Sequence, residues 1–262
     1  MSLPFVSARC NRGGAFAAAP AAPAGTTVSL IEGEQDVIDL APAAWFDASY
    51  DGAITESGGA VSKWTSREGN DIELVQATGA KQPTFTASHG DFNDYSTLSF
   101  DSSADQWIGI DARYVDTSGN VGTIFYVGKE QNGDSVARIV NWAFNGKSNI
   151  GTNFGANALF VYNPVKGFGT AGDQLSVYMA VVLINGSSSY CSMNEGTDAT
   201  FTAHADMTTD SGNTSVGGYG GASENSSTIA AEYIIFNTAL STGNVAKVEE
   251  YLKNKYKDGS SF

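Results

Sequence analysis

The stretch TIAAEYIIFNTALSTGNVAKVEEYLKNKYK, residues 228–257, decides the fold. Residues 228–236 are hydrophobic or small at nearly every position, and such a run predicts a strand that is buried on both faces. Strict alternation places its side chains in two sets, Ile229, Ala231, Tyr233 and Ile235 against Ala230, Glu232, Ile234 and Phe236.

After residue 240 the hydrophobic period changes from that of a strand to that of a helix. Apolar and aromatic residues recur at three- and four-residue intervals, at Val245, Val248, Leu252 and Tyr256. Ser241 is a suitable N-cap, and Gly259 is placed to end the helix. The pattern predicts one amphipathic C-terminal helix docked on a finished β structure, so function is to be sought in the β body and at the other end of the chain.

The composition favours a single all-β domain. The chain has 262 residues, of which 42% are hydrophobic, 11% aromatic and only 16% charged, and 30 are glycine. From about residue 41, short apolar runs alternate with clusters of Gly, Asn, Asp and Ser, which is typical of a β-sandwich. Trp45 and Trp64 lie in apolar strand patterns and are predicted to pack in the core.

The formal net charge of −14 argues against nucleic acid as a partner, because phosphates would be repelled. The sequence contains no apolar run of the roughly 18 residues that a membrane span requires. We therefore expect no nucleic-acid binding and no membrane insertion.

Residues 1–40 are predicted to form an extended arm rich in Ala, Pro and Gly, and residues 41–262 the globular domain. The arm cannot bury enough apolar surface to fold alone. One interpretation is a disordered tail. The other is an assembly arm that becomes ordered on a partner, and the residues that favour it are Phe5, Arg9, Arg12 and Phe16.

Several motifs resemble the concanavalin A-like lectin/glucanase superfamily in its laminin G-like branch. They are WFDAS (45–49), SGGAVSKWTSREGND (57–71), KQPTF (81–85), TLSFDSSADQWI (97–108) and AEYIIFNTALSTGNVAKVEEYLKNKY (231–256). Each motif alone is weak, but their order and spacing cover about residues 42–257. The resemblance implies a jelly-roll β-sandwich with one C-terminal helix behind the extended N-terminal arm.

The arm followed by this domain resembles structural proteins of bacteriophage particles. This implies a non-enzymatic virion component of the tail tip, fibre or head decoration, an oligomer that contacts other virion proteins through its arm and recognises a host-surface glycan. The expected location is the particle surface, or alternatively the extracellular space. Three alternatives stay open: a capsid decoration protein that only stabilises the shell, a secreted bacterial carbohydrate-binding module, and a glycoside hydrolase.

Two groups of residues are candidates for ligand binding. Sugar binding requires aromatic faces near amides and carboxylates, and the glycan-binding candidates are Trp107, Trp142, Tyr162, Tyr219 and Asn225. No cofactor is certain, but the resemblance makes calcium a candidate, because related domains hold it with loop oxygens. The metal candidates are Asp91, Asn93, Asp94, Asp101 and Asp105.

No catalytic residue is predicted. The string EQDVID at residues 34–39 resembles the acidic motif of the glucanase relatives, but it departs at its last position and precedes the predicted domain. His89 and His204 are far apart and lack a supporting motif, so they are interpreted as polar loop residues.

Overall fold

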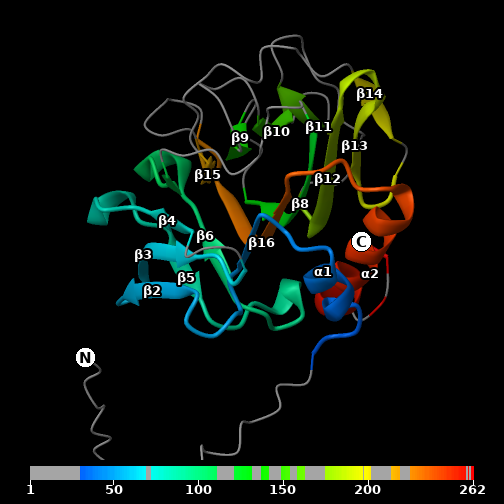
Figure 1. The fold of residues 1–262 in the computed structure, drawn as a ribbon. Helices are drawn as coiled ribbons and strands as arrows, with labels where there is room; N and C mark the ends of the chain where they lie inside the picture. The colour runs from blue at the N-terminus through cyan, green and yellow to red at the C-terminus, as the bar shows by residue number, and fades with distance from the viewer. Residues whose placement is uncertain are drawn as a thin grey trace, which may run out of the picture. The chain divides into compact units, whose positions relative to one another are not determined.

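The computed structural model describes residues 30–68, 72–110, 121–131, 137–141, 149–153, 158–162, 175–196, 198–201, 214–218, 225–257, 259 and 261–262. The described folded unit begins at Ile31. It is mostly β structure, and Figure 1 shows α2 packed beside the strands at one side of it. Every pairing between described strands is antiparallel.

The strands in chain order are β1 (Ala44–Asp47), β2 (Ile54–Ser57), β3 (Ala60–Thr65), β4 (Glu73–Val75), β5 (Thr84–Thr86), β6 (Thr97–Ser99), β7 (Ile108–Ile110), β8 (Val121–Glu130), β9 (Ala137–Asn141), β10 (Asn149–Asn153), β11 (Ala158–Tyr162), β12 (Tyr178–Asn185), β13 (Ser189–Met193), β14 (Ala199–Phe201), β15 (Thr214–Val216) and β16 (Thr228–Phe236). The helices are α1 (Glu34–Asp39) and α2 (Thr242–Lys257), with short 3-10 turns η1 (Gly79–Lys81), η2 (Gly90–Phe92), η3 (Ser102–Ala104) and η6 (Gly186–Ser188).

Strand β16 has neighbours on both sides in the strand order, and all its residues are buried, as its hydrophobic sequence predicts. The order is β11-β10-β9-β15-β7-β4-β3-β5-β6-β16-β8-β12-β13-β14, with β1 added to β16 and β2 to β3. On one side β16 pairs with β8, and on the other it pairs with β6 and then β1. The folded unit is therefore a β-sandwich whose sheets are joined into one hydrogen-bonded path.

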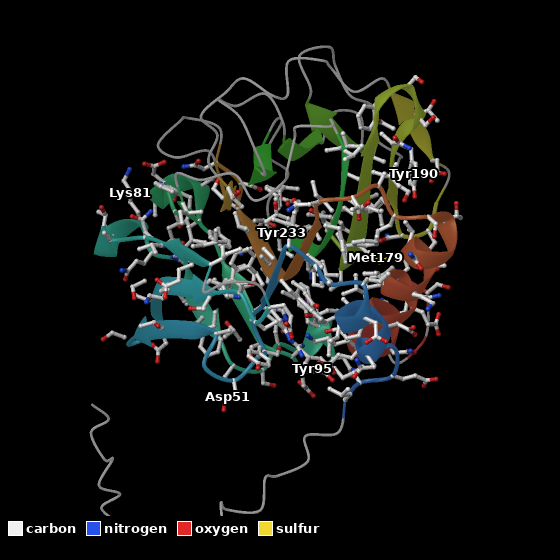
Figure 2. All side chains as sticks on the ribbon, viewed as in Figure 1. Asp51, Lys81, Tyr95, Met179, Tyr190 and Tyr233 are labelled. Carbon is white, nitrogen blue, oxygen red and sulfur yellow. The ribbon has the colours of Figure 1, made fainter. Side chains whose placement is uncertain are left out.

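Two hydrophobic cores hold the sandwich together. The first lies between the β layers and contains large buried side chains of many strands, among them Phe46, Trp64, Tyr126, Tyr178 and Tyr233. Figure 2 shows Tyr233 in the interior of the molecule. The second core lies between the opposite face of the β8, β12 and β16 strands and the two helices, and it contains Trp45, Phe125, Met179, Val248 and Leu252. Trp45 and Trp64 are fully buried, as predicted.

The predicted strict alternation of β16 is wrong at one point. The pairing of β16 with β8 shifts register between Ala230 and Glu232, which marks a β-bulge. As a result Ala231 packs in the helix-facing core while Glu232 also reaches α2, and Tyr233 returns to the core between the β layers. The bulge is the reason that a carboxylate can point from this buried strand toward the helix.

Helix α2 confirms the predicted amphipathic C-terminal helix. Its N-terminus is capped by Ser241, whose Oγ accepts a hydrogen bond from the Asn244 amide at 3.3 Å. Val245, Val248, Leu252 and Tyr256 are buried, as the period predicts. Beyond its end, the amide of Gly259 donates to the Lys253 carbonyl at 3.1 Å, and Gly259 has a φ of 76°. Such a left-handed conformation favours glycine after a helix.

Helix α1 lies inside the segment that the sequence analysis assigned to the arm, and it is part of the folded unit. Val37 packs in the helix-facing core, and Asp36 accepts a hydrogen bond from Lys247 of α2 at 2.8 Å. The Asn254 side chain donates to the carbonyl of Glu32 at 3.3 Å. Contact with the sandwich therefore begins near Ile31. Among the described residues, neither helix has both the length and the apolar character that crossing a membrane requires.

Candidate functional site

We call one part of the structure the Trp107 corner. It contains Lys81, Asp105, Trp107 and Asn225. Lys81 ends η1, Asp105 follows η3 in a left-handed conformation with φ 54°, Trp107 precedes β7, and Asn225 precedes β16. Asp105 accepts hydrogen bonds from the Lys81 ammonium and from the Asn225 amide. Figure 2 shows Lys81 at the edge of the molecule, on the side where β4 lies. The corner thus combines an aromatic ring, a carboxylate, an amide and an ammonium group.

The indole of Trp107 lies over a glycine. A Cβ atom on Gly109 would come within 3.1 Å of Trp107 Cζ3 and within 2.7 Å of Ser215 Cβ. Gly109 pairs with Ser215 of β15, so the missing side chain lets the indole lie beside both strands. Trp107 is only half-buried, and the side-chain amide of Gln76 donates to its carbonyl at 2.9 Å.

One end of the Asn225 side-chain amide is hydrogen-bonded to Asp105, and the other end has no hydrogen-bond partner among the described residues. Its side chain packs against Gly218, where a Cβ atom on that residue would clash with it. Asn225 is 8% exposed, and its Oδ1 has no hydrogen-bond partner among the described residues. The Nε1 of Trp107 is likewise buried and unpaired within the described structure. Unpaired buried polar atoms are costly, so two of them in one corner call for an explanation.

Asp101 lies on the same turn as Asp105. Its Oδ1 accepts hydrogen bonds from the amide of Ser103 at 2.8 Å and from the Ser103 hydroxyl at 2.7 Å. These hydrogen bonds lower the pKa of Asp101 and hold the group ionised. The corner therefore has two carboxyl groups near solvent, one at each end of η3.

A second polar cluster lies on the inner side of the segment 225–228. Glu130, at the end of β8, is fully buried and accepts a hydrogen bond from the Ser226 hydroxyl at 2.6 Å. The hydroxyl of Tyr178 lies 3.4 Å from Glu130. Burial, followed by the charge of Glu130, raises the pKa values of Tyr126 and Tyr178. Because Asn225 and Ser226 are consecutive and bond to Asp105 and Glu130 respectively, this segment lies between the two carboxyl groups.

A buried ionic network joins β1 and β16 to α2. The ammonium of Lys255 lies 2.7 Å from carboxylate oxygens of both Asp47 and Glu232. Glu232 also accepts hydrogen bonds from the Trp45 indole at 2.6 Å and from the Tyr256 hydroxyl at 2.7 Å. These groups are almost completely excluded from solvent, so we assign the network to stability and not to ligand binding.

Arg67 extends the network to α1. Its guanidinium contacts the carboxylates of Glu34 and Asp47 and lies over the ring of Trp45, 4.2 Å from the ring centre. Burial acts to lower the pKa of Arg67, but the hydrogen bond to Glu34 and nearby negative charge outweigh it and raise the pKa. Burial likewise acts to lower the pKa of Lys255, and the charges of Asp47 and Glu232 raise it overall. Burial raises the pKa of Glu232 against the opposing effect of Lys255.

An acidic group lies where α2 meets the end of β13. Burial, and then the charges of Glu195 and Asp198, raise the pKa of Glu249 to about 7, while Lys253 opposes them. Lys253 pairs with Glu195 at 3.0 Å. Burial and the charges of Asp198 and Glu249 also raise the pKa of Tyr190 to about 12. Figure 2 shows Tyr190 on the α2 side of the molecule, across the view from Lys81.

The candidates for a calcium site occupy two separate places. Asp91 pairs with Lys129 at 2.6 Å, Asn93 donates to the Lys255 carbonyl at 3.0 Å, and Asp94 accepts from Ser88 at 3.2 Å. Asp101 and Asp105 instead belong to the Trp107 corner. Within the described ranges, no group of three or more His, Cys, Asp or Glu side chains is arranged to hold a metal ion.

Of the predicted glycan-binding residues, the structure describes the side chains of Trp107 and Asn225, and Asn225 hydrogen-bonds to Asp105, two residues before Trp107. Trp142 and Tyr219 lie outside the described residues, and of Tyr162 only the backbone, in β11, is described. The arm residues Phe5, Arg9, Arg12 and Phe16, and also His204, lie outside the described residues as well. The sequence analysis did not select Lys81 or Gly109. Lys81 is the first residue of the KQPTF motif, and Gly109 directly follows the TLSFDSSADQWI motif, but neither residue type points to a ligand site.

Glu34 of the acidic string EQDVID accepts hydrogen bonds from the Ile31 amide, at 2.8 Å, and from Arg67. It is buried as part of the ionic network, and it is not one of the residues of the Trp107 corner. The other sequence candidate, His89, is half-buried with its ring edge against Phe92.

No family model matches the sequence, and no curated protein matches it. Solved structures do match the fold. An arabinofuranosidase complexed with arabinofuranosyl-α-1,2-xylobiose superposes with a TM-score of 0.57 at 13% identity, over 84% of this chain and 65% of the other. A GH54 α-L-arabinofuranosidase soaked with a cyclic sulfate inhibitor gives 0.55 at 12% identity, over 82% and 63%.

The sialidase of Trypanosoma rangeli in complex with the inhibitor DANA gives a TM-score of 0.53 at 10% identity, over 80% of this chain and 32% of the sialidase. The likeness shows a shared β-sandwich fold. This chain spans about a third of the sialidase and slightly under two thirds of the arabinofuranosidases.

These neighbours correct the expected function. The sequence analysis predicted a non-enzymatic phage virion protein, and the solved structures that share the fold are instead glycosidases by name. The virion prediction was wrong because it rested on the amino-acid sequence of the arm and on motifs that belong to the sandwich. A sandwich fold of this kind occurs in proteins of unrelated function. The glycoside hydrolase alternative agrees better with the structural neighbours.

Proposed function

We propose that the chain is a glycoside hydrolase on a concanavalin A-like jelly-roll sandwich, with the Trp107 corner as its glycan site. The observation that carries the proposal is the superposition of 84% of the chain on an arabinofuranosidase with bound oligosaccharide. Pockets for sugars combine an aromatic face with a few polar groups that fix orientation. The Trp107 corner contains sequence candidates for both kinds of group, because Asn225 bonds to Asp105, two residues before Trp107.

The motifs behind the resemblance support the finer fold assignment. Trp45 and Asp47 of WFDAS, Arg67 of the TSREGN turn, Glu232 of the AEY strand and Lys255 of the last helix form one buried network. Motif residues that lie far apart in the chain thus contact one another in a single buried network. That is expected when a pattern belongs to a fold and not to a ligand site.

Glycoside hydrolysis requires one carboxyl group as acid and another as nucleophile or base. In the Trp107 corner these groups are Asp101 and Asp105. Asp101 has a lowered pKa, which suits the carboxylate role. The Asp105 side chain is 39% exposed, and we assign to it the role of the acid. Glu130 is fully buried on the other side of the segment 225–228 and is given no catalytic role.

The test is hydrolysis by the purified chain of a panel of aryl α-L-arabinofuranosides, aryl sialosides and polysaccharides, followed as released phenol or reducing ends. Asp101→Asn and Asp105→Asn should each lower the rate roughly 10²–10⁴-fold, the usual contribution of an acid or base. Asp91→Asn is the matched control, because Asp91 is also a turn aspartate paired with one lysine.

Asp91→Asn should leave the rate unchanged. Turnover by the wild type that survives in both corner variants would place catalysis elsewhere. The absence of turnover on the whole panel, with the protein shown to be folded by circular dichroism, would overturn the hydrolase proposal.

A further inference from the structure

We propose that Lys255 and Asp47 condense to an intramolecular isopeptide bond, and that Glu232 carries the protons while the bond forms. This inference concerns a covalent modification of the buried ionic network and is independent of the proposed glycosidase activity. It starts from one lysine and two carboxyl groups that three separate elements, α2, β1 and β16, bring into contact.

The register of the sheet and the position of the helix hold the three groups together. Asp47 and Glu232 lie directly opposite each other in the pairing of β1 with β16. Lys255 Nζ lies 2.7 Å from Asp47 Oδ2 and 2.7 Å from Glu232 Oε2. Because Oδ2 is bonded to Cγ, the nitrogen is already close to the carbon that it attacks. Groups held in this way react as if at effective concentrations of up to about 10⁵–10⁸ M.

Lysine attacks a carboxyl carbon as a neutral amine. Burial acts to lower the pKa of Lys255 and so favours this form, although the charges of Asp47 and Glu232 raise the pKa overall and keep the ammonium as the resting form. Burial raises the pKa of Glu232, which suits its carboxylate to accept a proton from the ammonium. Transfer across the 2.7 Å hydrogen bond leaves an amine beside Asp47 and removes two buried charges.

The bond-forming step is a condensation that needs no oxidant and no further reactant. Lys255 Nζ forms a bond with Asp47 Cγ, and the bond from Cγ to Oδ2 breaks. Of the ammonium protons, one stays on the amide nitrogen, and the others leave with Oδ2 as water after passing through Glu232. Asp47 Oδ1 remains as the amide oxygen. It accepts a hydrogen bond from the Ser49 amide at 2.9 Å, and this donor stabilises negative charge on the oxygen during the attack.

Burial favours the amide over the ion pair. Lys255, Asp47 and Glu232 are 1%, 3% and 1% exposed, and the rings of Tyr251 and Tyr256 lie beside the ammonium. An ion pair in such a place retains the cost of desolvating both charges, whereas a neutral amide does not. Hydrolysis of the bond requires water, which the same packing excludes.

The experiment is mass spectrometry of the purified full chain after denaturation, and then of its tryptic peptides. The intact mass should lie below the calculated mass by the mass of one water molecule. Trypsin should fail to cut after Lys255, because an amide nitrogen replaces the ammonium. Peptide 254–257 should be joined to peptide 13–63, with fragmentation placing the link on Asp47.

The matched variant is Lys255→Arg, which keeps a positive charge but lacks the amine. It should show the full calculated mass, as should Glu232→Gln, which cannot carry the protons. An internal control is the pair of Lys247 with Asp36, which is equally close, at 2.8 Å, but roughly half exposed. Trypsin should cut after Lys247 as usual.

A folded wild type with the full calculated mass would overturn the proposal, and so would a loss of water that persists in Lys255→Arg or maps to other residues. A bond that still forms in Glu232→Gln would overturn the role of Glu232. Where Glu232→Gln fails to fold, the peptide map of the wild type alone decides whether the bond exists. Glycosidase activity enters none of these outcomes, so the two proposals fail separately.

Discussion

Lys255 carries its ammonium into a space that Asp47, Glu232 and the ring of Tyr256 enclose. Removing the lysine is costly, because Glu232 would remain buried without a cationic partner and Asp47 would keep only Arg67. A buried ion pair often adds little net stability over a well-packed apolar core, but breaking one side of it is expensive. The network therefore favours the one arrangement of α2 on the sheet in which Lys255 is paired with both carboxylates.

Replacing Lys255 by Met should lower the free energy of unfolding by about 3–5 kcal/mol, the usual penalty for an uncompensated buried charge. Urea denaturation followed by tryptophan fluorescence measures it. The control is Lys247→Met, in which an exposed lysine of the same helix loses a surface pair with Asp36, and its denaturation midpoint should hardly move. Equal effects of the two variants would show that the network is not buried as described.

Glu249 makes stability depend on pH near neutrality. Its pKa is about 7 in the folded protein and about 4.3 in the unfolded chain. The folded state therefore holds the proton more tightly, and stability is lost as pH rises from about 4.5 to 7. Glu249→Gln removes this loss. It should leave stability nearly unchanged at pH 4 and raise it by about 1–2 kcal/mol at pH 8, after allowance for partial exposure.

Thermal melting of both proteins from pH 4 to pH 8 tests the titration of Glu249. The difference in melting temperature between wild type and Glu249→Gln should grow as pH rises from about 4.5 to 7 and then stay constant. A difference that is the same at all pH values would mean that Glu249 does not titrate there.

At the level of single elements, the pairing of β7 with β15 depends on a residue without a side chain. A Cβ on Gly109 would lie 2.7 Å from the Thr214 carbonyl oxygen and from Ser215 Cβ. Gly109→Ala should therefore destabilise the domain by about 1–3 kcal/mol and shift the Trp107 indole. Gly79→Ala, in open space on η1, is the control and should be neutral. Calorimetric melting reports the loss of stability, and the tryptophan fluorescence maximum of the chain reports the shift of the indole.

Some elements could be predicted from the sequence because their signal is local. The burial of β16 follows from its hydrophobic run, and α2 follows from the spacing of Val245, Val248 and Leu252. The bulge at Glu232 has no local signal, since it is imposed by pairing with β8 and contact with Lys255. Helix α1 was interpreted as arm because its sequence is short and acidic, and its stability comes from contacts with α2 and Arg67.

In the Trp107 corner, too, the residue types could be predicted from the sequence, but the contacts between distant residues could not. Trp107, Asn225 and Asp105 were selected by residue type, which predicts what a side chain can do. The sequence analysis placed Trp107 and Asp105 in different lists, one for glycan and one for calcium, because nothing local reveals that Asn225 bonds to Asp105 over 120 positions. Long-range contacts of this kind depend on the strand order, and the strand order depends on the whole chain.

For the whole molecule, the excess of negative charge opposes compaction. With 28 acidic against 14 basic residues, the folded chain repels itself, and salt weakens this repulsion. Raising NaCl from about 10 mM to about 500 mM shortens the screening length from roughly 30 Å to roughly 4 Å and should raise the melting temperature. KCl should act equally, since the effect is screening. A fall in melting temperature would mean that surface ion pairs outweigh the net charge.

The position of β16 in the sheet has a consequence for how the protein is made. Strands β1, β6 and β8 all pair with β16, and β1 and β16 are linked by the hydrogen bond between Trp45 and Glu232 across 187 positions. A ribosome releases the chain from its N-terminus, so those strands emerge with exposed edges long before their shared neighbour exists. Pairings this distant also form slowly. The interval before residue 257 emerges is therefore when the nascent chain is most exposed to aggregation and most in need of a chaperone.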